Sequence, residues 1–157
     1  MMGDVAMDTF ISGLPIEKNL PKIIQYLQLN SALVLQAQPG AGKSTAVPLY
    51  LLQHLQLHDQ KIIMLEPRRL AARSIAEFLA QQLGEEVGQT VGYQVRNERK
   101  VSAKTRLEIV TEGVLSARIQ QDPELHGVGL IIFDEFHERS IHADFGLALC
   151  KEVAEVY

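Results

Sequence analysis

The sequence predicts an α/β fold in which helices cover both faces of a mostly parallel β-sheet. Three observations support this prediction. Short apolar stretches typical of buried strands alternate with helical stretches. A glycine-rich loop separates the first of these strands from the helix that follows. A pair of acidic residues comes directly after a later strand. Strands that alternate with helices favour parallel pairing, because each connection has to cross back over the sheet.

The first part of the chain contains the expected lead-in, helix and strand in that order. Residues 1–13 are expected to be a flexible lead-in, and residues 14–157 the folded domain. An amphipathic helix is expected over residues 17–29. The first strand is expected over residues 31–36, and a helix follows from about Lys43 to Leu57.

The remaining elements alternate in the same way. Strands are expected over Lys61–Leu65, Val91–Val95, Arg106–Val110 and Gly129–Phe133, and helices over Arg68–Leu83, Glu112–Gln120 and from about His142. The helix that begins at Arg68 has apolar positions at Leu70, Ile75, Phe78, Leu79 and Leu83, and Gly84 is expected to end it. The basic stretch from Arg96 to Arg106 is expected to be a solvated hairpin loop, with a contribution to nucleic-acid contact as the alternative.

The glycine-rich loop has the composition of a phosphate-binding loop (P-loop). Gly40 and Gly42 permit close backbone approach, so that N–H groups and the helix N-terminus can surround phosphate oxygens. Lys43 would reach the β- and γ-phosphates, and the hydroxyl of Ser44 would bind Mg²⁺. The expected nucleotide-binding residues are Ala37, Gln38, Pro39, Gly40, Ala41, Gly42, Lys43, Ser44 and Thr45. Ala37 stands where the usual pattern has glycine, and a simple tight turn before a capped helix is the alternative interpretation.

The acidic pair is placed where a nucleotide and its metal ion should lie. Ligands of open α/β sheets bind beyond the carboxyl ends of the strands, and Asp134 and Glu135 follow the strand that ends at Phe133. Asp134 is expected to hold Mg²⁺. Glu135 is expected to lie near the metal and to orient or deprotonate the attacking water. Solvated acids at a strand end are the alternative. His137 and His142 are five residues apart, which does not fit the four-residue spacing of a zinc-protease helix.

Five segments of the sequence, in this order, carry a resemblance to a known family. They are Gln36-Ala-Gln-Pro-Gly-Ala-Gly-Lys-Ser-Thr45, Glu66-Pro-Arg-Arg-Leu-Ala-Ala-Arg73, Val91-Gly-Tyr-Gln-Val-Arg96, Thr111-Glu-Gly-Val-Leu115 and Asp134-Glu-Phe-His-Glu-Arg-Ser140. Over roughly residues 15–150 the chain resembles DEAH/RHA-type helicases of superfamily 2, most closely the bacterial HrpB-like ATP-dependent helicases. Two departures are Phe136 in place of alanine and Glu112 in place of aspartate.

The resemblance implies a RecA-like first domain of an RNA-directed helicase that uses ATP and Mg²⁺. Lys43, Glu135 and His137 would be its catalytic residues, and His137 would couple the state of the γ-phosphate to motifs of a second RecA-like domain. That second domain and the arginine-finger motif have no counterpart in this sequence, so the domain is expected to be incomplete at its C-terminus. The implied partners are a single nucleic-acid strand, expected to be RNA, and the second RecA-like domain; the residues themselves leave RNA and DNA both open.

Two segments would contact the nucleic acid. Arg68 and Arg69 stand in the first turn of a helix, where cations oppose the helix dipole at a cost of about 0.3–1 kcal/mol each. A bound phosphate would reverse this cost, and the resemblance implies that this segment grips the strand. Ion-paired arginines are the alternative. Thr111 is expected to be a helix N-cap, and the resemblance adds a phosphate contact through Thr111, with Gly113 permitting close approach.

Composition limits the class of protein. The net charge is −4 and 46% of the residues are hydrophobic, so the overall charge does not indicate nucleic-acid binding. No stretch is apolar enough for a membrane span, and the N-terminus has no basic region typical of a secretory signal. The lone Cys150 favours a reducing compartment, so we expect a cytoplasmic protein. Two other functions remain open: a nucleotide-dependent nucleic-acid binding module, and a P-loop ATPase that acts on protein partners without unwinding.

Overall fold

The computed structural model describes residues 18–29 and 44–134 of the chain. The chain divides into two compact units, one ending at Gln56 and the other beginning at Leu57, and each is described by itself. The expected lead-in, the strand over 31–36 and the helix from His142 lie outside the described residues. Within the described part, no helix is long and apolar enough to cross a membrane.

The first unit contains two described helices that pack against each other, α2 (Leu20–Leu29) and α3 (Ala46–His54). Both helices were predicted, and both are shorter than expected. Pro48 lies in the first turn of α3, where its missing N–H removes no helical hydrogen bond. The helix ends where Leu55 adopts an extended backbone and its N–H donates to the carbonyl of Leu51 at 2.9 Å.

The second unit is built on a five-stranded sheet of order β3-β2-β4-β1-β5. Its elements are β1 (Lys61–Leu65), α4 (Arg69–Gln82), β2 (Val91–Val95), β3 (Glu98–Lys100), β4 (Leu107–Val110), α5 (Glu112–Gln121) and β5 (Val128–Phe133). Neighbouring strands are parallel except for β2 and β3, which form an antiparallel hairpin. The predicted mostly parallel sheet is therefore confirmed.

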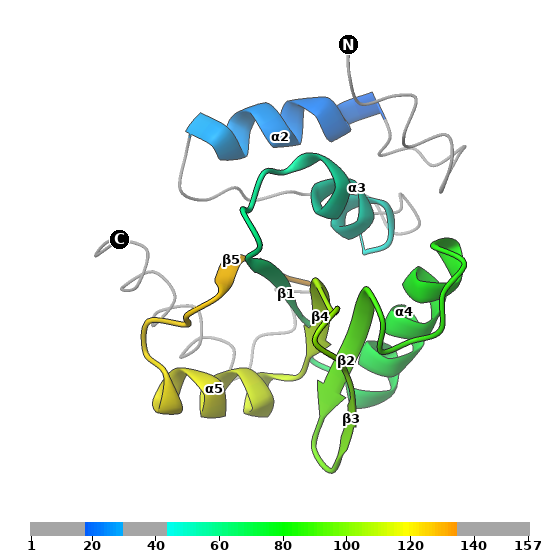
Figure 1. The fold of residues 1–157 in the computed structure, drawn as a ribbon, viewed down its shortest axis with the longest axis vertical. Coiled ribbons are helices and arrows are strands. Elements are labelled where there is room, and N and C mark those ends of the chain that lie inside the picture. The colour runs from blue at the N-terminus through cyan, green and yellow to red at the C-terminus, as the bar shows by residue number, and fades with distance from the viewer. Residues whose placement is uncertain (1–17, 30–43, 135–157) are drawn as a thin grey trace. The chain divides into compact units, whose positions relative to one another are not determined.

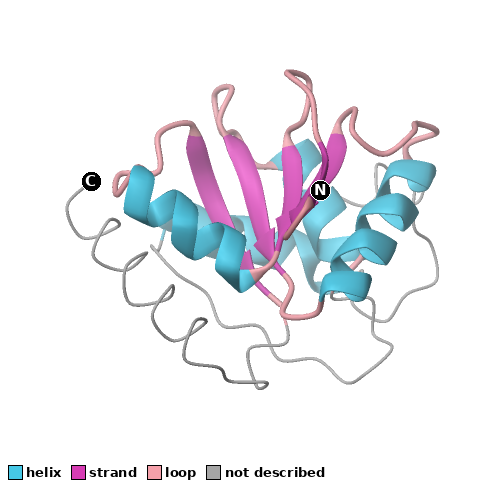
Figure 2. Ribbon diagram, turned by 90° about the horizontal axis from the view of Figure 1, so that it is seen from below, coloured by secondary structure: helices cyan, strands magenta, loops and turns pink. Residues whose placement is uncertain are grey.

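The two helices of this unit lie on opposite faces of the sheet. From β1 the chain passes through α4 to β2 on one side, and from β4 it passes through α5 to β5 on the other. Since such crossovers are right-handed, connections that run in opposite directions place their helices on opposite faces. Figure 1 shows α5 and α4 on either side of the strands, and Figure 2 shows the strands side by side with α5 in front of them.

The two faces are packed differently. On the α5 face, Ile63, Leu65 and Val110 of the strands pack against Leu115 and Ile119. On the other face, α4 packs against β2 and β4, and its buried residues are Ala72, Ala76, Leu79 and Ala80. Two of the five large apolar side chains noted in this helix are not part of that contact, since Leu70 is 80% exposed and Phe78 is 43% exposed.

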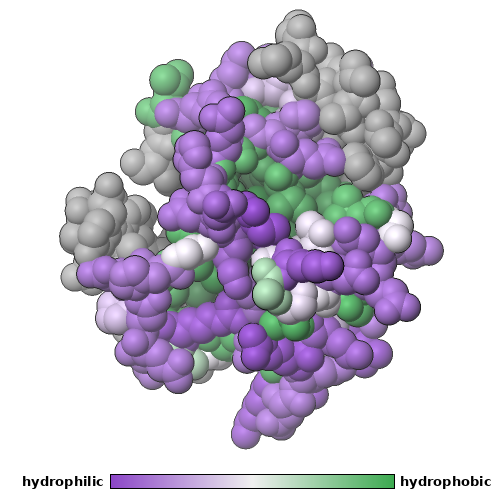
Figure 3. All heavy atoms as spheres, in the orientation of Figure 1, coloured by the Kyte–Doolittle hydropathy of each residue, from purple (hydrophilic) through white to green (hydrophobic). Residues whose placement is uncertain are grey.

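The hairpin of β2 and β3 is the main difference from the expected elements. Arg96 and Asn97 make its turn, and Asn97 has a φ of 66°, a left-handed conformation that asparagine tolerates. A strand, β3, therefore occupies the first part of the stretch expected to be a loop. The tip of the hairpin is uniformly hydrophilic, as the lowest part of the view in Figure 3 shows.

Candidate nucleotide and nucleic-acid site

The carboxyl ends of β4, β1 and β5 meet at one edge of the sheet. The N–H of Glu66, just after β1, donates to the carbonyl of Val110 at 2.9 Å. The N–H of Asp134, just after β5, donates to the carbonyl of Leu65 at 3.0 Å. The end of β1 therefore lies between Thr111, which follows β4, and Asp134. Three segments that the sequence singled out leave the sheet side by side, where open α/β sheets bind ligands.

Asp134, the predicted Mg²⁺ ligand, follows β5 at this edge of the sheet. It is 7% exposed, and its backbone is fixed by the hydrogen bond to β1. Mg²⁺ takes oxygen ligands, commonly one or two protein oxygens with the rest from phosphates and water. The carboxylate of Asp134 and the hydroxyl of Ser44 are ligands of this type. No group of three or more histidine, cysteine or acidic side chains suited to a metal occurs within residues 18–29 and 44–134.

Several predicted nucleotide-site residues lie outside the described residues. These are Ala37, Gln38, Pro39, Gly40, Ala41, Gly42 and Lys43 of the loop, and Glu135 and His137 after β5. Ser44 and Thr45 are described, in the turn that leads into α3 at Ala46. Ser44 belongs to the first unit and Asp134 to the second. The roles predicted for all these residues stay predictions.

Arg68 and Arg69 begin α4. Arg68 is the N-cap, with extended backbone angles (φ −107°, ψ 128°), and its carbonyl accepts a hydrogen bond from the N–H of Ala72 at 2.9 Å. Arg69 is the first helical residue, one position later than expected. Both side chains are exposed, and the first turn contains no acidic residue. Two cations at the positive end of a helix make this turn a favourable place for an anion.

Thr111 and Gly113 begin α5. Thr111 is the N-cap, as expected, and its carbonyl accepts a hydrogen bond from the N–H of Leu115 at 3.0 Å. Its side chain makes no capping hydrogen bond. Gly113 is exposed, and a Cβ placed on it would meet no described atom within 4 Å. Packing among the described residues therefore gives no reason for glycine at this position.

A polar cluster joins α4 to the hairpin, and sequence reasoning did not find it. Nε of Arg73 on α4 lies 3.0 Å from Oε1 of Glu77 on the same helix. Its Nη1 lies 3.4 Å from Oε1 of Glu98 on β3, and the hydroxyl of Tyr93 donates to the same oxygen at 2.7 Å. Burial and the hydrogen bond to Glu98 raise the pKa of Tyr93 to about 12, so its hydroxyl is protonated and can donate at neutral pH.

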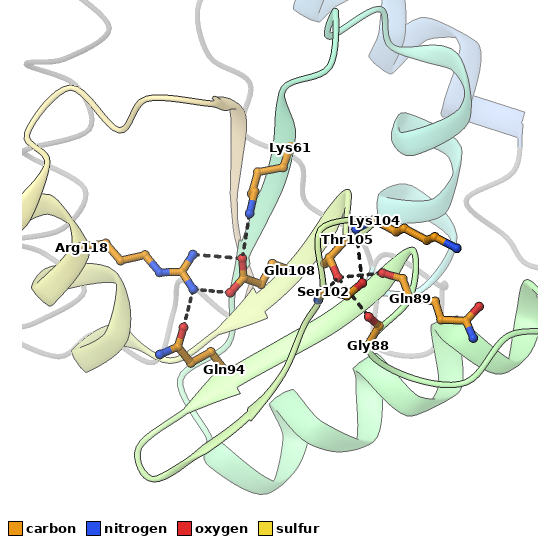
Figure 4. A network of polar contacts seen from close by, with 9 residues as sticks. All are labelled: Lys61, Gly88, Gln89, Gln94, Ser102, Lys104, Thr105, Glu108 and Arg118. Carbon is orange, nitrogen blue, oxygen red and sulfur yellow. Dashed lines mark hydrogen bonds and ion pairs between the residues drawn. The ribbon is translucent and has the colours of Figure 1, made fainter.

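A second polar network is buried on the α5 face (Figure 4). Glu108 on β4 accepts hydrogen bonds from both terminal nitrogens of Arg118 on α5, and Lys61 of β1 lies 3.5 Å from it. Arg118 also donates to Oε1 of Gln94 on β2 at 2.6 Å. Burial raises the pKa of Glu108, but Arg118 and Lys61 outweigh this effect and hold that pKa below its ordinary value. The sequence could have indicated this network, because Glu108 is an acid within an apolar strand and a buried charge needs partners.

Comparison with known proteins identifies relatives of the whole described region. Residues 20–153 match the family described as DEAD/DEAH box helicase. The chain is 53% identical over 145 residues to the ATP-dependent RNA helicase HrpB of Escherichia coli, covering 92% of this chain and 18% of that protein. It is 38% identical to the mouse ATP-dependent RNA helicase DHX29, covering 90% of this chain and 11% of that protein.

The fold is likewise similar to a solved structure. The crystal structure of the E. coli DEAH/RHA helicase HrpB superposes with a TM-score of 0.87, over 91% of this chain and 18% of that chain. The chain thus spans less than a fifth of the length of these relatives.

Proposed function

Because this chain belongs to the DEAD/DEAH box helicase family, we propose that it acts as the ATP-binding motor domain of an ATP-dependent RNA helicase. In this proposal residues 14–157 are RecA-like and work with a second RecA-like domain in the cytoplasm. The observation that carries the proposal is the common edge of β4, β1 and β5. It brings the candidate metal ligand Asp134 next to the segments that begin at Glu66 and Thr111.

The proposed nucleotide site combines metal ligands, a base and a phosphate-binding loop. Asp134 and Ser44 hold Mg²⁺, and Glu135 lies beside the metal, where it orients the attacking water and takes its proton. Residues 37–45 surround the phosphates with backbone N–H groups, and Lys43 adds a positive charge. When bound, Mg²⁺ neutralises charge on the β- and γ-phosphates. His137 transmits the state of the γ-phosphate to the second domain.

The proposed nucleic-acid site uses the two neighbouring helix N-termini. Strands β1 and β4 are paired, and paired strands lie about 4.7–4.9 Å apart, so the segments that follow them leave the sheet close together. Arg68 and Arg69 contact one part of the phosphate backbone, while Thr111 and the N–H groups near Gly113 contact another. Contacts to phosphates position a strand and read no base sequence. The substrate is accordingly a single strand of RNA of any sequence.

The strand β1 also offers a route for coupling. Its last residues are hydrogen-bonded to β5, which leads to Asp134, and to β4, which leads to Thr111. A change in the nucleotide at Asp134 can therefore alter the position of both nucleic-acid segments through a single strand end. In helicases of this kind such a change would move the bound RNA as the two RecA-like domains rearrange.

The test is steady-state ATP hydrolysis by the product of the complete reading frame that encodes this chain. Turnover is measured without nucleic acid, with single-stranded RNA and with single-stranded DNA, and Glu135→Gln provides the blank. Strong stimulation by RNA that disappears in the variant supports the proposal. Stimulation by DNA alone would change the proposed substrate. Turnover that neither polymer changes would contradict the motor and favour an ATPase that acts on a protein partner.

A further inference from the structure

In the N-terminal half of α4, which follows Arg68 and begins with Arg69, the fully buried side chains that face the sheet are small. Up to the middle of the helix, the buried side chains are those of Ala72 and Ala76, and the one large buried side chain, Leu79, lies near its end. Helices keep their orientation on a neighbour by inserting large side chains between those of the other element. Methyl groups allow close approach but offer little resistance to rotation. With Ile75 only half-buried, packing fixes the first turns of α4 less firmly than its end, where Leu79 is buried.

An ion pair adds a constraint on the orientation of α4 that the packing of small side chains does not provide. Arg73 stands four residues after Arg69, so the two side chains leave the same face of the helix. Nη1 of Arg73 lies 3.4 Å from Oε1 of Glu98 on β3. The same oxygen accepts the hydrogen bond of Tyr93 at 2.7 Å, and Tyr93 is 1% exposed within the core. The face of α4 that carries Arg69 is thus tied, through Glu98, to a buried anchor in β2.

The role of Glu98 differs from that of the other acid next to Arg73. Glu77 also pairs with Arg73, at 3.0 Å, but it lies on the same helix and moves with it. Exposed ion pairs of either kind contribute little to stability. What separates the two acids is that Glu98 joins α4 to another element and Glu77 does not.

We propose that Glu98 is a positioning residue for nucleic-acid binding, which orients the first turn of α4 so that Arg68 and Arg69 meet the phosphate backbone together. This inference rests on the proposed function, since it assumes that these arginines contact the strand. Glu98 itself touches no nucleic acid in the proposal. Glu98 acts by pairing with Arg73, which holds the first turn of α4 in its orientation.

The experiment compares Glu98→Gln with Glu77→Gln in the product of the complete reading frame. Both substitutions remove one negative charge next to Arg73, so a purely electrostatic effect would strengthen the binding of an RNA anion in both variants. If Glu98 positions the helix, Glu98→Gln should instead weaken binding of a fluorescein-labelled oligouridine by about three- to tenfold. The slope of log Kd against log salt concentration should fall by about 1, as expected when one phosphate contact is lost.

Turnover provides a second measurement that a general loss of structure would not reproduce. In Glu98→Gln the RNA concentration for half-maximal stimulation of ATP hydrolysis should rise, while turnover without RNA and at saturating RNA stays unchanged. Tyr93→Phe, which removes only the hydroxyl, should shift the RNA concentration in the same direction. Glu77→Gln should leave it unchanged or lower it.

The outcomes separate this inference from the proposed function. If Arg68→Ala with Arg69→Ala does not change RNA affinity, the proposed contact itself fails. If that double variant weakens binding but Glu98→Gln and Glu77→Gln behave alike, the contact stands and the positioning role of Glu98 is contradicted. Weaker binding by Glu98→Gln together with a lower urea midpoint than Glu77→Gln would also contradict it, because the loss would then be one of stability.

Discussion

Tyr93 and Gln94 are consecutive residues of β2, and their side chains reach helices on opposite faces of the sheet. Tyr93 donates to Glu98, which is paired with Arg73 of α4, while Gln94 accepts from Arg118 of α5. Neighbouring residues of a strand point to opposite faces, so two adjacent residues of β2 can connect this strand to α4 on one face and to α5 on the other. The two helices whose first turns carry the candidate nucleic-acid residues are therefore held by the same short strand.

Gly92, one residue earlier, is required by close packing. A Cβ on Gly92 would overlap the carbonyl oxygen of Lys100 and would lie 2.9 Å from Cγ1 of Val101. Because the nearer atom belongs to the backbone, the hairpin would have to move. We expect Gly92→Ala to lower the free energy of unfolding by about 1–3 kcal/mol, the usual cost of overpacking. Urea denaturation of the 157-residue chain measures the change, and an unchanged midpoint would show that the hairpin accommodates the methyl group.

Unlike substitution of Gly92, substitution of Gly113 by alanine is expected to leave stability intact and to affect RNA binding. Its Cβ would meet no atom of the described residues within 4 Å, and alanine favours a helix over glycine by about 0.8–1 kcal/mol in its interior. Gly113→Ala should therefore leave the fold as stable as before or slightly more so. If the phosphate backbone approaches α5 closely at this point, the same substitution should weaken RNA binding severalfold. RNA affinity that equals that of the unsubstituted protein would exclude a close approach here.

The strands were predicted well because their signals are local. Lys61–Leu65 and Val91–Val95 were predicted with the bounds that the structure shows, since apolar runs bounded by polar residues depend little on the rest of the fold. The short β3 was missed because its residues, Glu98 to Lys100, are all charged. Its pairing comes from the turn at Arg96 and Asn97 and from the space that Gly92 leaves for it.

The face that α4 buries could not be predicted from hydrophobicity alone. Leu70 and Phe78 are exposed, while Ala72 and Ala76 are buried, because small side chains let the helix lie close to β2 and β4. The candidate site was predictable as motifs, but its common edge depends on the order of the strands. Nothing local in the sequence places β1 between β4 and β5.

Asp134 should control the effect of Mg²⁺ on nucleotide binding. Asp134→Asn keeps the size of the side chain and removes the charge that attracts the metal, so affinity for a fluorescent ATP analogue in the presence of Mg²⁺ should fall by about tenfold or more. In EDTA, the variant and the unsubstituted protein should bind the analogue alike. A Mg²⁺ titration that gives the same curve for both proteins would remove Asp134 from the metal site.

Glu108 should make the stability of the chain depend on pH in the acid range. Because its pKa is lower in the folded protein than the ordinary value of 4.5, the stabilisation it provides is complete above that value. This stabilisation decreases as the pH falls below 4.5. It is lost completely once the pH has passed the lowered pKa, because the folded protein then also takes up the proton. Loss of one partner from a buried ion pair costs about 3–5 kcal/mol, so Arg118→Met should be strongly destabilising at neutral pH.

The substitution Glu108→Gln tests the same network from the other side. It removes the titrating group while keeping an acceptor for Arg118, so the variant should be less stable at neutral pH, and the difference should shrink below pH 4.5. Urea midpoints across this range measure it, with Glu86→Gln as a control because Glu86 is an exposed acid. If the pH profile of Glu108→Gln runs parallel to that of the unsubstituted chain, the acid sensitivity arises elsewhere and Glu108 is not held as a charged carboxylate.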